Sequence, residues 1–63
     1  MTHTATPRLV GPLGIYVVRD GSEYYAEIVD IHGRELARLG PEDNSRDAET
    51  SADQWVAKHR QPP

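Results

Sequence analysis

Residues 14–31 read GIYVVRDGSEYYAEIVDI, and this stretch decides the fold of the chain. β-Branched and aromatic residues are frequent in both halves of it, which favours β-strands. Between the halves lies Asp20-Gly21, a pair typical of tight hairpin turns, because glycine readily adopts the positive φ angle that such turns require. The stretch therefore predicts an antiparallel hairpin with strands at about 14–20 and 23–31.

The two predicted strands divide their side chains between two faces, because alternate residues of a strand point to opposite sides. In the second strand Ala26 and Ile28 share one face, whereas Glu27 lies on the other. The face that carries Glu27 is the better candidate for solvent. Four apolar or aromatic residues are expected on this uncovered face: Tyr16, Val18, Tyr25 and Val29.

A third strand is predicted at about 34–39, after a turn that ends at Gly33. Leu36 is the residue of this strand that we expect to enter the core. The pair Gly40-Pro41 is expected to end the sheet, since proline has no N–H group to donate to a neighbouring strand.

The C-terminal part of the chain has the periodicity of a helix, predicted at about 50–60. Small, apolar or aromatic side chains recur at helical spacing on one stripe: Ala48, Ala52, Trp55, Val56 and His59. Trp55 is expected to be the central packing residue, and Thr50 and Ser45 are alternative N-caps. The predicted fold class is α+β, a three-stranded antiparallel meander packed on one C-terminal helix.

The domain organisation that follows is simple. Residues 1–8 are expected to form a flexible N-terminal tail, and residues 61–63 a C-terminal tail. Residues 9–60 form a single small βββα domain, within which 9–14 are either a leading turn or a short extended edge segment.

Length and composition exclude several classes of function. The chain has 63 residues, no cysteine and a formal net charge of −3. A domain of this size has a marginal core and no room for a deep substrate cavity. Disulfides and thiolate zinc sites are excluded, and the three histidines do not have metal-ligand spacing. We therefore expect no enzyme activity, no cofactor, no metal and no small-molecule substrate.

Membrane and calcium binding are not expected either. No run of 18 apolar residues is present, and the N-terminus lacks the pattern of a secretory signal, so a cytoplasmic location is the default expectation. The acidic segment 42–49 lacks the alternating oxygen ligands and central glycine of a calcium loop, which favours a solvated loop.

The run from Ile15 to Arg60 resembles two known families. One resemblance combines the aromatic pair Tyr24-Tyr25, the turn that ends at Gly33, Leu36, and a helix opened by Ser or Thr with alanines on one face. This arrangement is similar to the YegP-like family of small bacterial proteins, whose unit is three strands and a helix. That resemblance implies a fold and no agreed activity.

The second resemblance is to the arm-type DNA-binding domain of phage tyrosine integrases. It is carried by Ala52-Asp53-Gln54-Trp55 in a helix that follows a three-stranded sheet. The resemblance implies DNA binding by the sheet, for which Arg19, Arg34 and Arg38 would supply phosphate or base contacts. Such domains are basic on the sheet, whereas acidic residues accompany the arginines here: Glu23, Glu27, Asp30 and Glu35.

The sequence favours a small non-enzymatic interaction module, in the manner of a phage or bacterial accessory protein. One helix can cover only one face of the sheet, which leaves Tyr16, Val18, Tyr25 and Val29 as candidate contacts for a protein partner or a second copy. Pairing through an open sheet edge is a further route to a homodimer. The alternative is DNA binding by the sheet.

Overall fold

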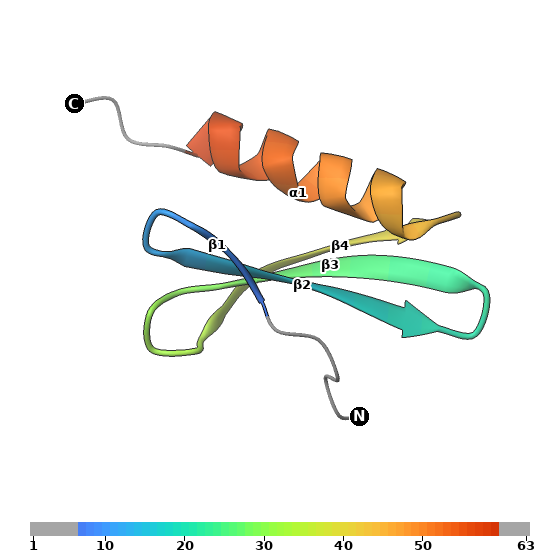
Figure 1. Cartoon of the computed structure of the whole chain (residues 1–63), viewed down its shortest axis with the longest axis horizontal. Coiled ribbons are helices and arrows are strands. Elements are labelled where there is room, and N and C mark those ends of the chain that lie inside the picture. Colours follow the sequence, from blue (N-terminus) through green and yellow to red (C-terminus); the bar gives the residue numbers. More distant parts are fainter. Residues whose placement is uncertain (1–6, 60–63) are drawn as a thin grey trace.

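A computed structural model describes residues 7–59, which form a four-stranded antiparallel sheet and one helix. The strands are β1 (Arg8–Val10), β2 (Leu13–Asp20), β3 (Glu23–Val29) and β4 (Glu35–Glu42), and they are neighbours in this order. The helix α1 (Ser45–His59) follows β4 and lies along one face of the sheet (Figure 1). The α+β class is confirmed, whereas the predicted number of three strands is wrong.

The central hairpin of β2 and β3 confirms the strands predicted at 14–20 and 23–31, with β3 ending two residues earlier, at Val29. Asp20 pairs with Glu23, so Gly21 and Ser22 form a two-residue turn. Gly21 has a φ of 66°, the conformation for which glycine is favoured in such turns.

The additional strand β1 lies at the edge of the sheet beside β2, with Leu9 opposite Gly14. Of the two alternatives for residues 9–14, the edge segment is the observed one, and Gly11 (φ 59°) lies in the turn that follows it. Arg8, which we assigned to a flexible tail, belongs to β1. The rest of that predicted tail that precedes Pro7 lies outside the described residues, as does the predicted tail at 61–63.

The edge strand β4 continues to Glu42, so the prediction that Gly40-Pro41 ends the sheet is wrong. Proline is tolerated there because β4 has a neighbour on one side only. The register between β3 and β4 shifts twice. Val29 lies opposite Glu35 while Ile28 lies opposite Ala37, and a second shift falls between Tyr24 and Ala26.

The first register shift displaces Leu36 from the core, contrary to prediction. Leu36 lies between the two paired positions as the extra residue of a β-bulge, and it is 47% exposed. Ala37 and Leu39 pack against the core in its place.

The helix α1 begins at Ser45, five residues before the predicted start. Neither Ser45 nor Thr50 is the N-cap. The Asp47 N–H donates to the Asn44 side-chain oxygen at 2.8 Å, which satisfies one of the amides that a helix leaves unpaired at its start. Near this end of the helix, the Ser51 hydroxyl donates to the Glu42 carboxylate at 2.9 Å and so joins α1 to β4.

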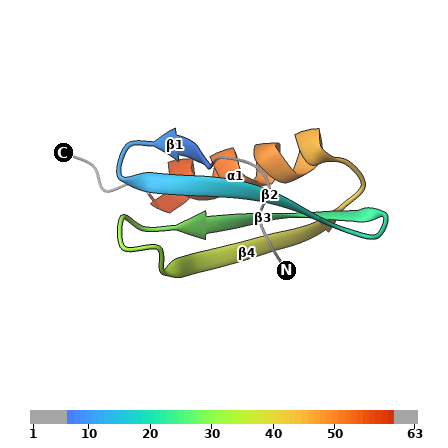
Figure 2. The same ribbon diagram turned by 60° about the horizontal axis from the view of Figure 1, so that its bottom comes forward.

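The helix α1 and the sheet form two layers (Figure 2). The core lies between them and is built largely from small residues. Ala48, Ala52 and Val56 repeat every four residues along the buried stripe of the helix, as expected from the sequence. They meet sheet residues that are also buried: Ile15, Ala26 and Ile28. Trp55 is half-buried at the border of this cluster, so it is not the central packing residue that we expected.

Candidate functional site

The face of the sheet opposite α1, called the open face below, is the candidate functional surface. Residues paired directly across antiparallel strands point to the same side. Tyr16 lies opposite Glu27 and Val18 lies opposite Tyr25, while Ile15 lies opposite Ile28 in the core. The residues of this face therefore follow from the register of the sheet: Leu9, Gly14, Tyr16, Val18, Asp20, Glu23, Tyr25, Glu27, Val29, Glu35 and Arg38.

The structure places all four predicted contact residues on the open face, but it does not expose them equally. Tyr16, Tyr25 and Val29 are half-buried and present surface to solvent. Val18 is only 6% exposed, although it belongs to no part of the cluster beneath α1. Val18 is therefore covered by its neighbours on the open face and offers very little contact area to a partner.

Tyr25 is held in place by its neighbours on the open face. The Arg38 guanidinium lies 4.6 Å from the centre of the Tyr25 ring, a cation–π contact, and the Tyr25 hydroxyl donates to Glu23 at 3.3 Å. The ring also lies close to Gly40, where an added Cβ would be 2.8 Å from Tyr25 Cδ2. Desolvation, followed by the negative charge of Glu23, raises the pKa of the Tyr25 phenol above its ordinary value.

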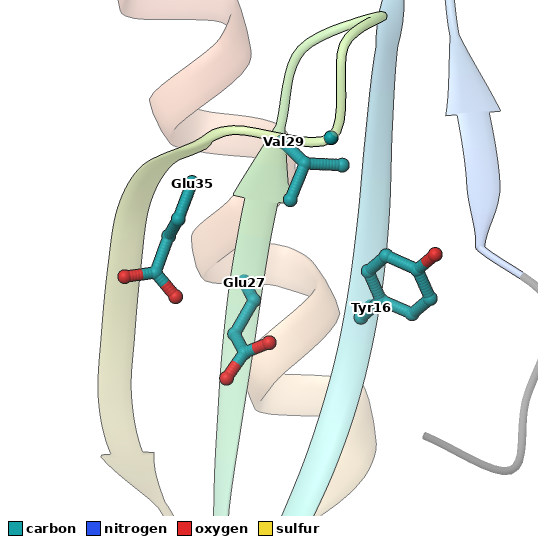
Figure 3. Close-up of a pocket in the computed structure, with 5 residues that line it drawn as sticks. Tyr16, Glu27, Val29 and Glu35 are labelled. Atoms are coloured by element: carbon teal, nitrogen blue, oxygen red, sulfur yellow. The ribbon is translucent and has the colours of Figure 1, made fainter. Parts of the chain in front are cut away.

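A hollow of about 250 Å³ opens on this face near the turn between β3 and β4 (Figure 3). Three adjacent strands and the turn supply its lining: Tyr16, Glu27, Val29, Gly33 and Glu35. The hollow thus has a phenol and an isopropyl group as apolar walls and two carboxylates as polar ones. We call it the acidic hollow.

The two carboxylates of the acidic hollow differ in their surroundings. The Glu27 side chain is only 13% exposed, and its carboxylate lies 3.8 Å from the Arg38 guanidinium, a long ion pair. Glu35 is exposed and forms no hydrogen bond or ion pair among the described residues. The acidic hollow is thus lined by two carboxylates, of which Glu27 lies beside the Arg38 guanidinium and Glu35 does not.

The three arginines proposed for DNA contact are not brought together. Arg19 lies on the face that carries α1, where its Nε donates to the Gly21 carbonyl at 2.8 Å. Arg34 lies in the turn before β4, and Arg38 alone lies on the open face. These arginines also have acceptors or counter-charges within the fold, so no continuous basic surface forms on the sheet.

The turn between β3 and β4 is organised by Asp30. The Asp30 carboxylate accepts hydrogen bonds from the backbone N–H groups of Arg34 (2.9 Å) and His32 (2.8 Å), and it pairs with the Arg34 guanidinium at 3.0 Å. The hydrogen bond from the Arg34 backbone is the largest influence among these, and together they lower the pKa of Asp30. Arg34 and His32 thus stabilise the turn that borders the acidic hollow.

Sequence reasoning missed two residues of the open face, Leu9 and Glu35. Leu9 is 77% exposed, and Gly14 joins it to Val29 in one row across the sheet. No alternation could place Leu9, because its strand is only three residues long. Glu35 was assigned as an acidic neighbour of the arginines, and only the register shift at Leu36 brings it to the hollow.

Other kinds of site find no support in residues 7–59. No group of three or more histidine and acidic side chains in this range could hold a metal ion. No described helix is long and apolar enough to cross a membrane. Comparison of the chain with family models, curated proteins and solved structures finds no match.

Proposed function

We propose that the protein is a non-enzymatic interaction module that binds a protein partner, or a second copy of itself, through the open face. The observation that carries the proposal is the asymmetry of the sheet: α1 covers one face, and the other presents the half-buried Tyr16, Tyr25 and Val29 beside the exposed Leu9. An aromatic and aliphatic surface within a ring of charges is typical of protein interfaces.

The open face is better suited to a partner than the β4 edge. Pro41 removes one donor from that edge, and the two register shifts make the strand irregular. On the other side, β1 pairs only with Leu13, Gly14 and Ile15 of β2, so no described strand covers the outer edge of β2 from Val17 to Asp20. This part of the β2 edge is the secondary route by which a partner strand could extend the sheet.

DNA binding by the sheet has less physical support. The one arginine of the open face, Arg38, contacts Tyr25 and Glu27, and two further carboxylates, Glu35 and Glu23, lie on or beside this face. Carboxylates repel the phosphate backbone, and a binding surface for DNA normally neutralises several phosphates. A fluorescence anisotropy titration with duplex DNA at low salt is expected to show no binding at tens of micromolar protein.

Site-specific photo-crosslinking in the native host tests the proposal. A benzophenone amino acid placed at Leu9 or Tyr16 is expected to give discrete crosslinked protein species. Placed at Gln54 or Ala57, which lie exposed on α1, it is expected to give none. Equal crosslinking from the helix positions, or none from the open face, would overturn the proposal.

Sedimentation velocity separates a second copy from a different partner. If the open face forms a homodimer, the protein sediments as a dimer, and Leu9→Ser shifts it toward the monomer because it removes an exposed apolar side chain from the interface. Ala57→Ser is the matched control on α1 and leaves the sedimentation unchanged. A monomer at all concentrations assigns the face to a different protein.

A further inference from the structure

We infer that an extended segment of a protein partner adds to the outer edge of β2 as an antiparallel strand, with an acidic side chain opposite Arg19 and an apolar one opposite Val17. Among the described strands, β1 lies along only the first part of this edge (Figure 2). The inference rests on the secondary route of the proposed function and specifies what the partner presents there. Strand addition uses backbone groups in the plane of the sheet, so this site is separate from the open face.

The backbone groups available at the edge belong to Val17 and Arg19. Asp20 forms a hydrogen-bonded pair across the two-residue turn, so every second residue back from it directs its N–H and C=O groups to β3. The residues between them direct these groups outward. Arg8 of β1 pairs with Ile15 on this side, but no described residue pairs with Val17 or Arg19 there. A partner strand can therefore form four hydrogen bonds with these two residues.

Arg19 carries a charge that the described part of the chain does not neutralise. Its side chain is exposed on the face that carries α1 and forms no ion pair among residues 7–59. Its Nε donates to the Gly21 carbonyl at 2.8 Å, and the guanidinium lies 5.9 Å from the centre of the Tyr24 ring. These contacts orient the guanidinium and leave its two Nη groups for an acceptor. Residues directly opposite in antiparallel strands share a face, so a carboxylate opposite Arg19 forms a charge-assisted pair.

Val17 defines the second position of the partner segment. Its side chain is partly buried against the cluster beneath α1, in a row with Ala26 and Leu39. β1 already adds Val10 to the border of this cluster from the beginning of the same edge. An apolar side chain opposite Val17 would extend that border and gain buried area. Because every second residue of a strand shares a face, the segment consists of an acidic residue, any residue and an apolar residue.

β1 limits the length of the segment. A strand antiparallel to β2 runs in the same direction as β1, and Arg8 already occupies the place beside Ile15. After the apolar residue opposite Val17, at most about one more residue fits before the partner chain meets β1 and has to leave the edge. The site therefore takes a short segment and not a long strand.

The same geometry argues against a second copy as the occupant. A symmetric pairing of two β2 edges centred on Val18 would place the copy's Gly21 where Arg8 of β1 lies. A centre at Arg19 spares β1 but sets two arginines opposite one another, and a centre at Asp20 opposes two aspartates. A different protein with an acidic residue in its segment avoids these conflicts.

Nuclear magnetic resonance with synthetic peptides provides the test. The probe is the capped pentapeptide serine-threonine-glutamate-threonine-valine, and glutamine replaces glutamate in an uncharged version. The glutamate peptide is expected to bind with a dissociation constant on the order of 1 mM. The amide protons of Val17 and Arg19 should then exchange more slowly with solvent, since they gain acceptors. The amide of Val18 is directed to β3 and should change little.

N-methylated peptides separate strand addition from charge attraction alone. In the proposed pairing the N–H groups of glutamate and valine donate to β2, so methylation of both should weaken binding at least about tenfold. Methylation of the threonine between them, whose N–H is directed away from β2, is the matched control and should weaken binding less than about twofold. Equal effects of the two methylations would overturn the inference.

Charge variants test the position of the acidic residue. The wild-type protein is expected to bind the glutamate peptide about two- to fivefold more tightly than the glutamine peptide. Arg19→Gln should abolish this preference, whereas Arg46→Gln, at an exposed arginine of α1 without an ion pair among the described residues, should retain it. A preference that survives Arg19→Gln, or no preference in the wild type, would overturn the inference. The spectra of the two variants show directly that both are folded.

The two proposals fail separately. Crosslinks from Leu9 and Tyr16, together with no binding of the glutamate peptide, would retain the open face and reject the strand at the edge. Peptide binding at the edge without any crosslink from these positions would reject the open face and retain the edge. If the amides of Val17 and Arg19 gain protection with rising protein concentration and no peptide, the edge belongs to a second copy and the inference is overturned.

Discussion

Arg8 Nη2 lies 2.7 Å from Asp53 Oδ1, so an ion pair joins β1 to α1 across 45 positions of sequence. Arg8 Nε also lies 3.2 Å from Glu49 Oε1, one helical turn away from Asp53. The hydrogen bond to Asp53 is the largest influence on Arg8, and it raises the pKa of the guanidinium above its ordinary value. The side chain of Arg8 thus links the three-residue strand β1 to the helix through two ion pairs.

Arg8→Ala is expected to loosen β1 more than it destabilises the whole fold. The three side chains are about half exposed, so solvent screens the pairs, and the loss of global stability is about 0.5–1 kcal/mol. The amide protons of β1 should exchange faster with solvent while those of β3 keep their protection, which hydrogen exchange by nuclear magnetic resonance measures. Arg46→Ala, at an exposed arginine without an ion pair among the described residues, is the control.

Gly40→Ala is expected to destabilise the protein by more than about 2 kcal/mol. Gly40 has a φ of 134°, and a Cβ there would lie 2.8 Å from both the Tyr24 carbonyl oxygen and Tyr25 Cδ2. Gly21→Ala is the matched control, because its φ is also positive but nothing lies within 4 Å of the added atom. Its loss should be only about 1–2 kcal/mol. Urea unfolding of both variants measures these losses of unfolding free energy. Equal losses would contradict the close packing of Tyr25 against Gly40.

Ala52→Leu is expected to destabilise the fold by about 1–3 kcal/mol through overpacking. Ala52 is fully buried, and Ala48 beside it on the helix and Ala26 on the sheet are fully buried as well. Small side chains on both sides allow the helix and the sheet to approach closely, which leaves no space for a larger residue. Ala57→Leu places the same side chain on the exposed side of α1 and should change stability by less than about 0.5 kcal/mol. Thermal unfolding that ranks the two variants equally would refute this description of the core.

Asp30→Asn is expected to reduce the loss of stability in acid. The folded protein lowers the pKa of Asp30 below its ordinary value of 3.8, so the charged carboxylate stabilises the fold above that value. This contribution disappears as the pH falls from about 4 through the lowered pKa of the folded state, because the carboxylate becomes protonated. Urea unfolding at pH 6 and pH 3 should show a smaller difference for the variant than for the wild type. An equal difference in both proteins would contradict the role of Asp30.

The central hairpin and the helix could be predicted from sequence because their signals are local. Asp20-Gly21 specifies a turn, alternation assigns Ala26 and Ile28 to the core face, and the alanine spacing specifies the buried stripe of α1. The additional strand could not be predicted, since three residues carry no periodicity. It depends on contacts of Arg8 with residues more than 40 positions away.

The open face was predicted in part, and the acidic hollow was not predicted. Alternation placed Tyr16, Tyr25 and Val29 correctly, but it could not show that Val18 is buried. The hollow depends on which residue of β4 faces Val29, and this register is determined by a bulge that no residue pattern marks. The start of the helix was also predicted wrongly. Asn44 is the N-cap, and the first turn of α1 is polar, so the apolar periodicity begins only at Ala48.

The two bulges of β4 have a joint consequence for the polarity of the sheet. With uninterrupted alternation from Arg38, Glu35 would point toward the helix and Glu42 away from it. Each extra residue inverts the parity of the strand beyond it, so Glu35 comes to face outward opposite Val29 and Glu42 comes to lie opposite Tyr24, within reach of Ser51. The number of residues in β4, and not only their identity, therefore decides which acid each face carries. Deletion of Leu36, the extra residue, would leave Glu35 opposite Val29 and make the pairing of β3 and β4 regular at this point.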